Sequence, residues 1–488
     1  MSTINIKPTE YRIIQGYKSR PVEFDPVKTK RLAVIGGVLM LSVLAGTILG
    51  GVDPLYGLVV VAAPLAVVGL LYFLGRFDLA PLLVLLAAAF LPVGVPTGTG
   101  SKLVASLVLT LVFTGIWFMR MVAVEKRFYL EPTSLNIPLF GFMIATVVSL
   151  LWSNLLRDPL VNWRTFSPVQ LASTVVMIML PGAFLLMINH VKSRQVLMGM
   201  TGLMLLAGTI GLVKQYEIVY LPINTGGMFT MWIISLSAGL AIFWKRLHPF
   251  GRLILLGLTG VWVIWGFVLH ISWLAGWLPG LAALGVLTAM RSKKMLIAIA
   301  LVGAVIFFFN SDYYLGKVLG NESNESGGTR LAAWEVNWRV TGQHLLFGTG
   351  PAGYASYYMS YFPHDAMATH SNYVDIVAET GLVGFAFYIW FFIALTWKGY
   401  KLCLRLKNRG DFYESLANAA LAGTVAGIVA MAIGDWLIPF AYTQTIAGFD
   451  YSVYCWLFMG AIVVIDKLTK EEVAAGKPAI AVQPAQAQ

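Results

Sequence analysis

The feature that most constrains this chain is a succession of apolar runs, each close to the length of a helix that crosses a lipid bilayer. Such a helix needs about 20 apolar residues, with a range of about 17–25. The runs occupy residues 32–50, 55–74, 79–94, 103–123, 137–152, 169–189, 196–213, 228–244, 253–270, 274–290, 295–309, 372–397, 417–438 and 448–466. Because several runs are short and Pro81 and Pro92 interrupt the third, we expect 12 to 14 transmembrane helices. The predicted fold class is an all-α, polytopic integral membrane protein.

The composition excludes a set of soluble domains of the same total length. Hydrophobic residues make up 58% of the 488 residues and charged residues 12%, whereas soluble domains average about 45–50% and about 25%. So few charges cannot coat several globular surfaces, and lipid must therefore cover most of the exterior. The two cysteines, Cys403 and Cys455, have no CxxC spacing, which excludes a disulfide framework or a cysteine-based metal site as the organising feature.

The distribution of cations predicts the orientation of the chain. Lys and Arg outnumber Asp and Glu by 34 to 23, a formal net charge of +11. With the N-terminus in the cytoplasm, most of these cations fall in cytoplasmic loops and tails, as expected because translocating positive residues is unfavourable. The cations expected outside are Lys102, Arg157, Arg164, Lys214, Lys317, Arg330 and Arg339. The excess is therefore mostly a topology signal, and both termini are expected in the cytoplasm.

One connection, residues 310–371, is much longer than the others and is expected on the periplasmic side. Long loops are usually either functional or disordered. Trp334 and Trp338 are four residues apart and would share one helix face, so we expect a short amphipathic helix at about 329–344. The predicted organisation is a cytoplasmic tail (1–31), transmembrane helices (32–309), a long periplasmic loop with short amphipathic helices (310–371), further transmembrane helices (372–466) and a disordered cytoplasmic tail (467–488).

The end of this loop and the start of the next helix hold polar residues in an apolar setting. They are His370, Asn372, Asp375 and Glu379. Acidic residues inside a membrane helix are costly and are tolerated mainly when they face the bundle interior or a wet cavity. Asp375 and Glu379 therefore either satisfy a neighbouring helix or line an outward-facing chamber with His370 at its mouth.

The histidines and the outer cations predict different kinds of site. None of the loop histidines belongs to an HExxH metal-binding motif, and we expect no metal and no cofactor. Each outer arginine could extend to a lipid phosphate at the headgroup level. Several arginines converging on one cavity would instead bind a diphosphate, because guanidinium holds phosphate through two parallel hydrogen bonds.

A pattern of about 55 residues resembles the O-antigen ligase and polymerase superfamily of bacterial inner membranes. It consists of RLAAW from Arg330, QHLLFGTGPAG from Gln343, HSNY from His370 and ETGLVG from Glu379. Members of that family place the pattern in a long periplasmic loop and the helix after it. The resemblance implies transfer of a glycan from an undecaprenyl-diphosphate carrier to a sugar hydroxyl at the periplasmic face, without a nucleotide sugar or a metal.

The resemblance also implies roles for individual residues. It assigns the family's proposed catalytic histidine to His370, whose imidazole could take the proton of the attacking hydroxyl, and the family's loop arginine to Arg330, which would neutralise charge on the departing diphosphate. The further substrate-binding candidates are Arg339, Arg164, Lys214, Trp334, Asn372 and Glu379. The expected partners are the carrier-linked glycan, an acceptor glycan such as the lipid A core, and the bilayer, with no nucleic acid.

One departure from the family pattern leaves alternatives open. Many ligases carry a Ser-Arg-Gly-like motif at the outer end of an earlier helix, where this chain has Trp273 in place of the arginine. Lys214 and Arg164 are the candidate replacements. The alternatives are a polymerase of the same superfamily, a polysaccharide-related transporter or flippase, and an inactive scaffold. The transporter is disfavoured because transporters usually show paired broken helices in two related halves.

Overall fold

The computed structural model describes residues 76–92, 94–97, 101–156, 161, 166–219, 223–313, 316, 327–361 and 369–476. The chain divides into two units, Met1–Leu79 and Ala80–Gln488. The described part of the first unit is short and contains the 3-10 helix η2 (Phe77–Leu79). The expected tail 1–31 and the expected spans 32–50 and 55–74 lie outside the described residues and stay predictions.

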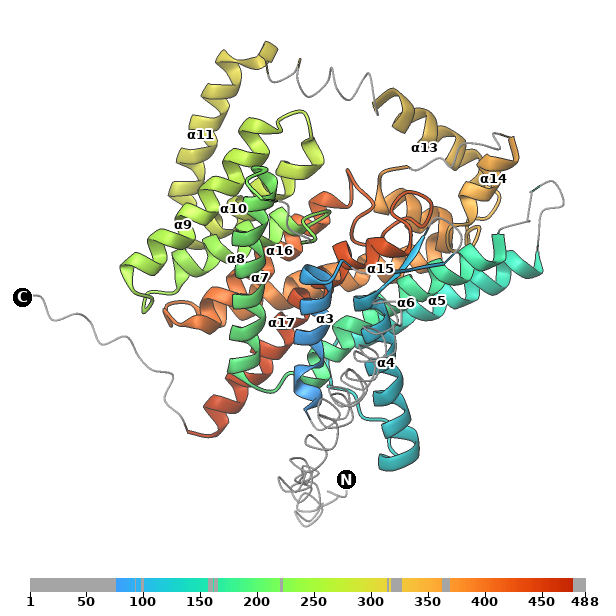
Figure 1. Ribbon diagram of the computed structural model, residues 1–488, viewed down its shortest axis with the longest axis horizontal. Coiled ribbons are helices and arrows are strands. Elements are labelled where there is room, and N and C mark those ends of the chain that lie inside the picture. Colours follow the sequence, from blue (N-terminus) through green and yellow to red (C-terminus); the bar gives the residue numbers. More distant parts are fainter. Residues whose placement is uncertain are drawn as a thin grey trace, which may run out of the picture. The chain divides into compact units, whose positions relative to one another are not determined.

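The second unit is built of helices, which confirms the all-α, polytopic membrane class (Figure 1). In the described residues, nine segments are long and apolar enough to cross a membrane. They are α4 (Ala105–Met119) with η3 (Arg120–Glu125), α5 (Asn136–Leu155), α6 (Phe166–His190), α7 (Arg194–Gln215), α9 (Pro249–Val263) with η4 (Ile264–Leu269), α10 (Leu274–Arg291), α15 (Asn372–Leu406), α16 (Phe412–Ala430), and η6 (Ile446–Gly448) with α17 (Phe449–Ala474).

Shorter elements complete this unit. Three are apolar helices: α3 (Ala80–Phe90), α8 (Phe229–Phe243) and α11 (Lys293–Phe309). The strands β1 (Gly94–Pro96) and β2 (Lys102–Val104) pair antiparallel in a small hairpin, with Val95 opposite Leu103. The total of 12 to 14 spans stays a prediction, because two of the expected runs lie outside the described residues.

The interior of this unit is formed by α8, α16 and α17, which are buried along most of their length. Small residues bring α8 and α16 close together. A Cβ on Gly239 would lie 2.7 Å from the Cβ of Ala419, and the hydroxyl of Ser235 donates a 2.7 Å hydrogen bond to the Ala419 carbonyl. Without an aqueous driving force between helices, such close backbone approach and interhelical hydrogen bonds stabilise membrane helix pairs.

The helix bounds differ from the apolar runs at two places near the C-terminus. The run 417–438 is helical only to Ala430, and the chain then turns repeatedly until η6 begins at Ile446. Residues 431–438 are apolar enough to look like a continuation of the helix, but Gly434 and the following Pro439 do not favour a helix there. At the other place, α17 continues through Ala474, eight residues into the expected tail, and residues 477–488 lie outside the described residues.

The long loop contains two helices, α13 (Gly327–Thr341) and α14 (Gly353–Tyr361). The first agrees with the helix expected at about 329–344. Both helices pack against α15, and α14 also contacts α6. The loop is therefore folded onto the helix that follows it (Figure 1).

Helix α15 is interrupted at Gly381, where φ is 67° and ψ is −172°. The interruption leaves backbone amides and carbonyls on both sides without helical hydrogen bonds, and the backbone of residues 345–350 pairs with them. The Ala378 carbonyl accepts from the Thr349 amide at 2.8 Å, and the Leu382 amide donates to the Leu345 carbonyl at 2.8 Å. A broken helix is tolerated at membrane depth only where other protein groups re-satisfy its backbone, so residues 345–350 and the break depend on each other.

We predict that Gly381→Ala destabilises the protein. The backbone conformation of Gly381 is one that essentially only glycine adopts, and an added Cβ would also meet the Leu346 carbonyl oxygen. The expected cost is about 1–3 kcal/mol, measured as a lower thermal unfolding midpoint in detergent. The matched control is Gly257→Ala in α9, where nothing lies within 4 Å of the added Cβ. Equal midpoints for the two variants would contradict the prediction.

Candidate active site

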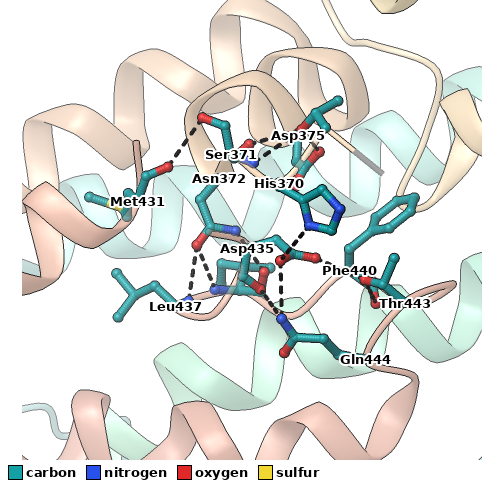
Figure 2. Close-up of polar contacts among 12 residues, drawn as sticks. His370, Ser371, Asn372, Asp375, Met431, Asp435, Leu437, Phe440, Thr443 and Gln444 are labelled. Atoms are coloured by element: carbon teal, nitrogen blue, oxygen red, sulfur yellow. Dashed lines mark hydrogen bonds and ion pairs between the residues drawn. The ribbon is translucent and has the colours of Figure 1, made fainter. Parts of the chain in front are cut away.

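His370 lies two residues before the start of α15 and faces Asp435 in the turns that follow α16 (Figure 2). Its Nδ1 is 3.9 Å from Oδ1 of Asp435. The imidazole is 44% exposed and the Asp435 side chain only 3%, so one side of the ring faces outward while the other faces a buried carboxyl group. The backbone of His370 has a φ of 51°, a left-handed conformation that is uncommon for residues other than glycine.

Asp435 is held in place by side chains of the same turn region. The Thr443 hydroxyl donates to Oδ2 at 2.9 Å, and the Gln444 amide nitrogen donates to Oδ1 at 3.1 Å. A buried acidic group fixed in this way can orient a histidine when the two form a hydrogen bond, which leaves Nε2 as the atom that accepts a proton. Here the 3.9 Å between Nδ1 and Oδ1 is an ion-pair distance and is longer than a hydrogen bond.

Asn372 joins the His370 segment to the Asp435 segment. Its side-chain oxygen accepts from the amides of Leu437 at 3.0 Å and Ile438 at 3.3 Å, and its nitrogen donates to the Ile438 carbonyl at 2.7 Å. Asn372 is completely buried. This predicted binding residue thus holds the two segments together from a fully buried position.

Two further contacts fix the residue before His370. The indole of Trp334 in α13 donates a 2.8 Å hydrogen bond to the Thr369 carbonyl. The Thr369 hydroxyl donates to Asp375, which also accepts a 2.6 Å hydrogen bond from the Tyr354 hydroxyl in α14. The other Asp375 oxygen has no hydrogen-bond partner among the described residues. The loop helices and α15 therefore together determine where the imidazole sits.

Glu379 faces the turn before α14. Its carboxyl oxygen Oε1 accepts a 2.8 Å hydrogen bond from the Ala352 amide, and the side chain is buried. Tyr354 lies between this carboxyl group and Asp375 and stacks on Phe440, with ring centroids 4.8 Å apart. Burial, and next the nearby acidic groups of Asp375 and Glu379, raise the pKa of Tyr354 well above its usual range. Its hydroxyl therefore stays protonated and acts as a donor.

The predicted cations are not brought together at this site by the described contacts. Arg339 pairs with Glu335 at 2.6 Å and is 74% exposed, and Lys214 donates to the Ile223 carbonyl at 2.6 Å. Arg330 lies in α13, one helical turn before Trp334, and its side chain is outside the described part of the structure. Arg164 also lies outside it.

Sequence reasoning missed Asp435, Thr443 and Gln444. Asp435 lies within the apolar run 417–438, which hydropathy predicts to be one membrane helix. Two signals could have found it: an acidic residue in an otherwise apolar run points to a functional or buried site, and Gly434 before it with Pro439 after it favours a turn.

In the described ranges, no group of three or more His, Cys, Asp or Glu side chains is arranged to hold a metal ion. His344 instead contacts the Tyr357 hydroxyl through Nε2 at 3.0 Å, and His364 lies outside those ranges. The expectation of a reaction without metal or cofactor stays a prediction.

Comparison with known proteins finds one family model that is similar to part of the chain. Residues 218–389 match the family model described as O-Antigen ligase, a range that contains His370, Asn372 and Glu379 and ends before Asp435. No curated protein matches the chain. The family match confirms the resemblance based on the motifs from Arg330 to Glu379.

We predict that Asn372→Ala loosens the contact between the His370 and Asp435 segments. The substitution leaves two amides and one carbonyl buried without partners, at a cost of about 1–3 kcal/mol. The expected result is a lower thermal unfolding midpoint and faster proteolysis within residues 431–445. Gln343→Ala, which removes an exposed amide side chain, is the control. Unchanged proteolysis of Asn372→Ala would contradict a clamping role.

Proposed function

We propose that the chain, whose residues 218–389 match the O-antigen ligase family model, transfers a glycan from an undecaprenyl-diphosphate carrier to a sugar hydroxyl. The proposed reaction takes place at the periplasmic face of the bacterial inner membrane, with both termini in the cytoplasm. The proposed acceptor is the lipid A core, and transfer to that acceptor would make the chain a ligase.

The observation that carries the proposal is the His370–Asp435 pair. A partly exposed imidazole lies 3.9 Å from a buried carboxyl group that two donors hold in place. General base catalysis needs such an oriented acceptor within reach of the proton that it removes. Transfer of a sugar to an alcohol needs this chemistry, because a neutral hydroxyl is a weak nucleophile.

In the proposed step, Nε2 of His370 takes the proton of the acceptor hydroxyl while its oxygen attacks the anomeric carbon of the donor sugar. A new C–O bond forms, and the bond between that carbon and the diphosphate oxygen breaks. The diphosphate leaves with the electron pair. Asp435 stabilises the imidazolium ion that forms, as the third member of a catalytic triad does.

The departing diphosphate needs cations rather than an acid. We assign this role to Arg330, with Arg339, Arg164 and Lys214 as further candidates, because guanidinium stabilises phosphate charge effectively. Arg330 is one turn from Trp334 in α13, and Trp334 bonds the residue next to His370. That connection supports Arg330 over the other three. Since the carrier is a polyprenyl lipid, its chain would reach the site from the bilayer.

We predict that His370→Ala lowers glycan transfer by about 10²–10⁴-fold, the usual contribution of a general base. Asp435→Asn keeps the shape of the side chain and is expected to lower transfer by about 10²-fold. The measurement is turnover of a purified carrier-linked donor by folded protein in lipid nanodiscs. Arg330→Ala, which removes the cation proposed for the diphosphate, is measured in the same transfer assay.

The control for Asp435→Asn is Glu471→Gln. Glu471 is exposed and lies near the end of α17, roughly 30 Å along the helix from its first turn. Near wild-type turnover of folded His370→Ala would remove His370 from the active site. Deleting the gene and separating the lipopolysaccharide on a gel then distinguishes the two acceptors. Free polymer with a bare core supports the ligase, whereas a core capped by one repeat indicates the polymerase.

The proposed orientation predicts which positions a membrane-impermeant thiol reagent labels in intact cells. A cysteine at position 339 should react from outside, and one at position 293 should not. Both positions are exposed in the structure. The native thiols of Cys403 and Cys455 are buried, so they give little background. Labelling at 293 without labelling at 339 would reverse the topology and contradict the proposed location of the site.

A further inference from the structure

Trp273 directly precedes α10 and reaches the region of the candidate site from a distant part of the chain. Its indole packs edge-on against Trp436, with ring centroids 5.7 Å apart and an interplanar angle of 66°. Trp436 follows Asp435 directly. The turn at Trp273 therefore belongs to the same local structure as Asp435, the carboxyl group that faces His370.

The orientation of the Trp273 indole is fixed from two sides. Trp265 packs against it at right angles, with ring centroids 6.3 Å apart, and the ring lies so close to Gly276 that a Cβ there would meet it. The turn itself is held by His270, whose carbonyl accepts from the Trp273 amide at 3.0 Å. Despite these contacts, Trp273 remains 39% exposed.

We propose that Trp273, supported by Trp436, is a stacking platform for a hexopyranose ring of the reacting glycan. The inference rests on the proposed function, because a reaction at an anomeric carbon beside His370 places sugar rings close to Asp435 and Trp436. One face of a pyranose ring is lined by C–H groups and is apolar, so covering it with an aromatic face removes apolar surface from water.

A rigid aromatic ring suits this task better than a flexible side chain. Stacking on an indole costs little conformational entropy when the ring is already immobilised, as Gly276 and Trp265 immobilise this one. The platform accepts different sugars, since stacking reads the apolar face of a ring and not its pattern of hydroxyls. Hydrogen bonds from other residues would then set the identity of the sugar.

The test measures binding to the full-length protein in nanodiscs, without transfer. The probes are undecaprenyl diphosphate, the same lipid carrying one N-acetylhexosamine, and the methyl glycoside of that sugar. Trp273→Ala is expected to weaken binding of a sugar-bearing probe about tenfold, the scale of one lost aromatic stack. Binding of the sugar-free diphosphate is expected to stay unchanged. A loss confined to the lipid-linked sugar assigns the platform to the donor, and a loss confined to the methyl glycoside assigns it to the acceptor.

Two further variants separate stacking from a structural role. Trp273→Phe should retain most of the sugar binding. Gly276→Ala should weaken it, because the added Cβ displaces the indole without removing it. Gly285→Ala is the control in the same helix, where nothing lies within 4 Å of the added Cβ. An equal loss for the sugar-free and sugar-bearing probes, or no loss for either in Trp273→Ala, would overturn the inference. Because the experiment measures binding and not transfer, its result can be interpreted even if the chain proves not to be a transferase.

Discussion

The rest of the site depends on how the backbone of α15 is satisfied where the helix breaks at Gly381. Unpaired backbone groups at membrane depth cost several kcal/mol each, so the break exists only with residues 345–350 in place against it. That pairing attaches the long loop to α15. It also brings the turn at Ala352 to Glu379 and places α14 beside the first turns of α15.

The segment before the break carries His370, and the partner of His370 comes from a second loop 65 residues later in the chain. Two loops can hold a histidine and a carboxyl group at a defined distance only if something rigid joins them. Asn372 does so with three hydrogen bonds to residues 437 and 438. The left-handed backbone of His370 is an unfavourable conformation. It follows Thr369, whose carbonyl accepts from Trp334 and whose hydroxyl donates to Asp375.

The spans could be predicted from sequence because hydropathy reports burial in lipid directly: the expected run 274–290 is the helix Leu274–Arg291. The same signal failed at Asp435. An apolar stretch packed inside a membrane protein has the same composition as a spanning helix, so run length alone did not reveal that 431–438 forms turns. Motif resemblance located His370 and Asn372, but the hydrogen bonds of Asn372 depend on a contact between distant segments that no local pattern encodes.

Charge divides the proposed site into two halves. Asp435 lies beside His370, and α15 carries Asp375 in its first turn and Glu379 one turn further on; in the described ranges no Lys or Arg forms an ion pair with these three acidic side chains. Acidic surroundings of this kind suit a base and a sugar, but they do not attract a diphosphate, which is itself negatively charged. In the proposed reaction, cations for the leaving group would come from another element, and α13 carries Arg330 one turn from Trp334. The hydrogen bond from Trp334 to the Thr369 carbonyl would then couple the two proposed halves, because it joins the helix that carries Arg330 to the residue beside His370.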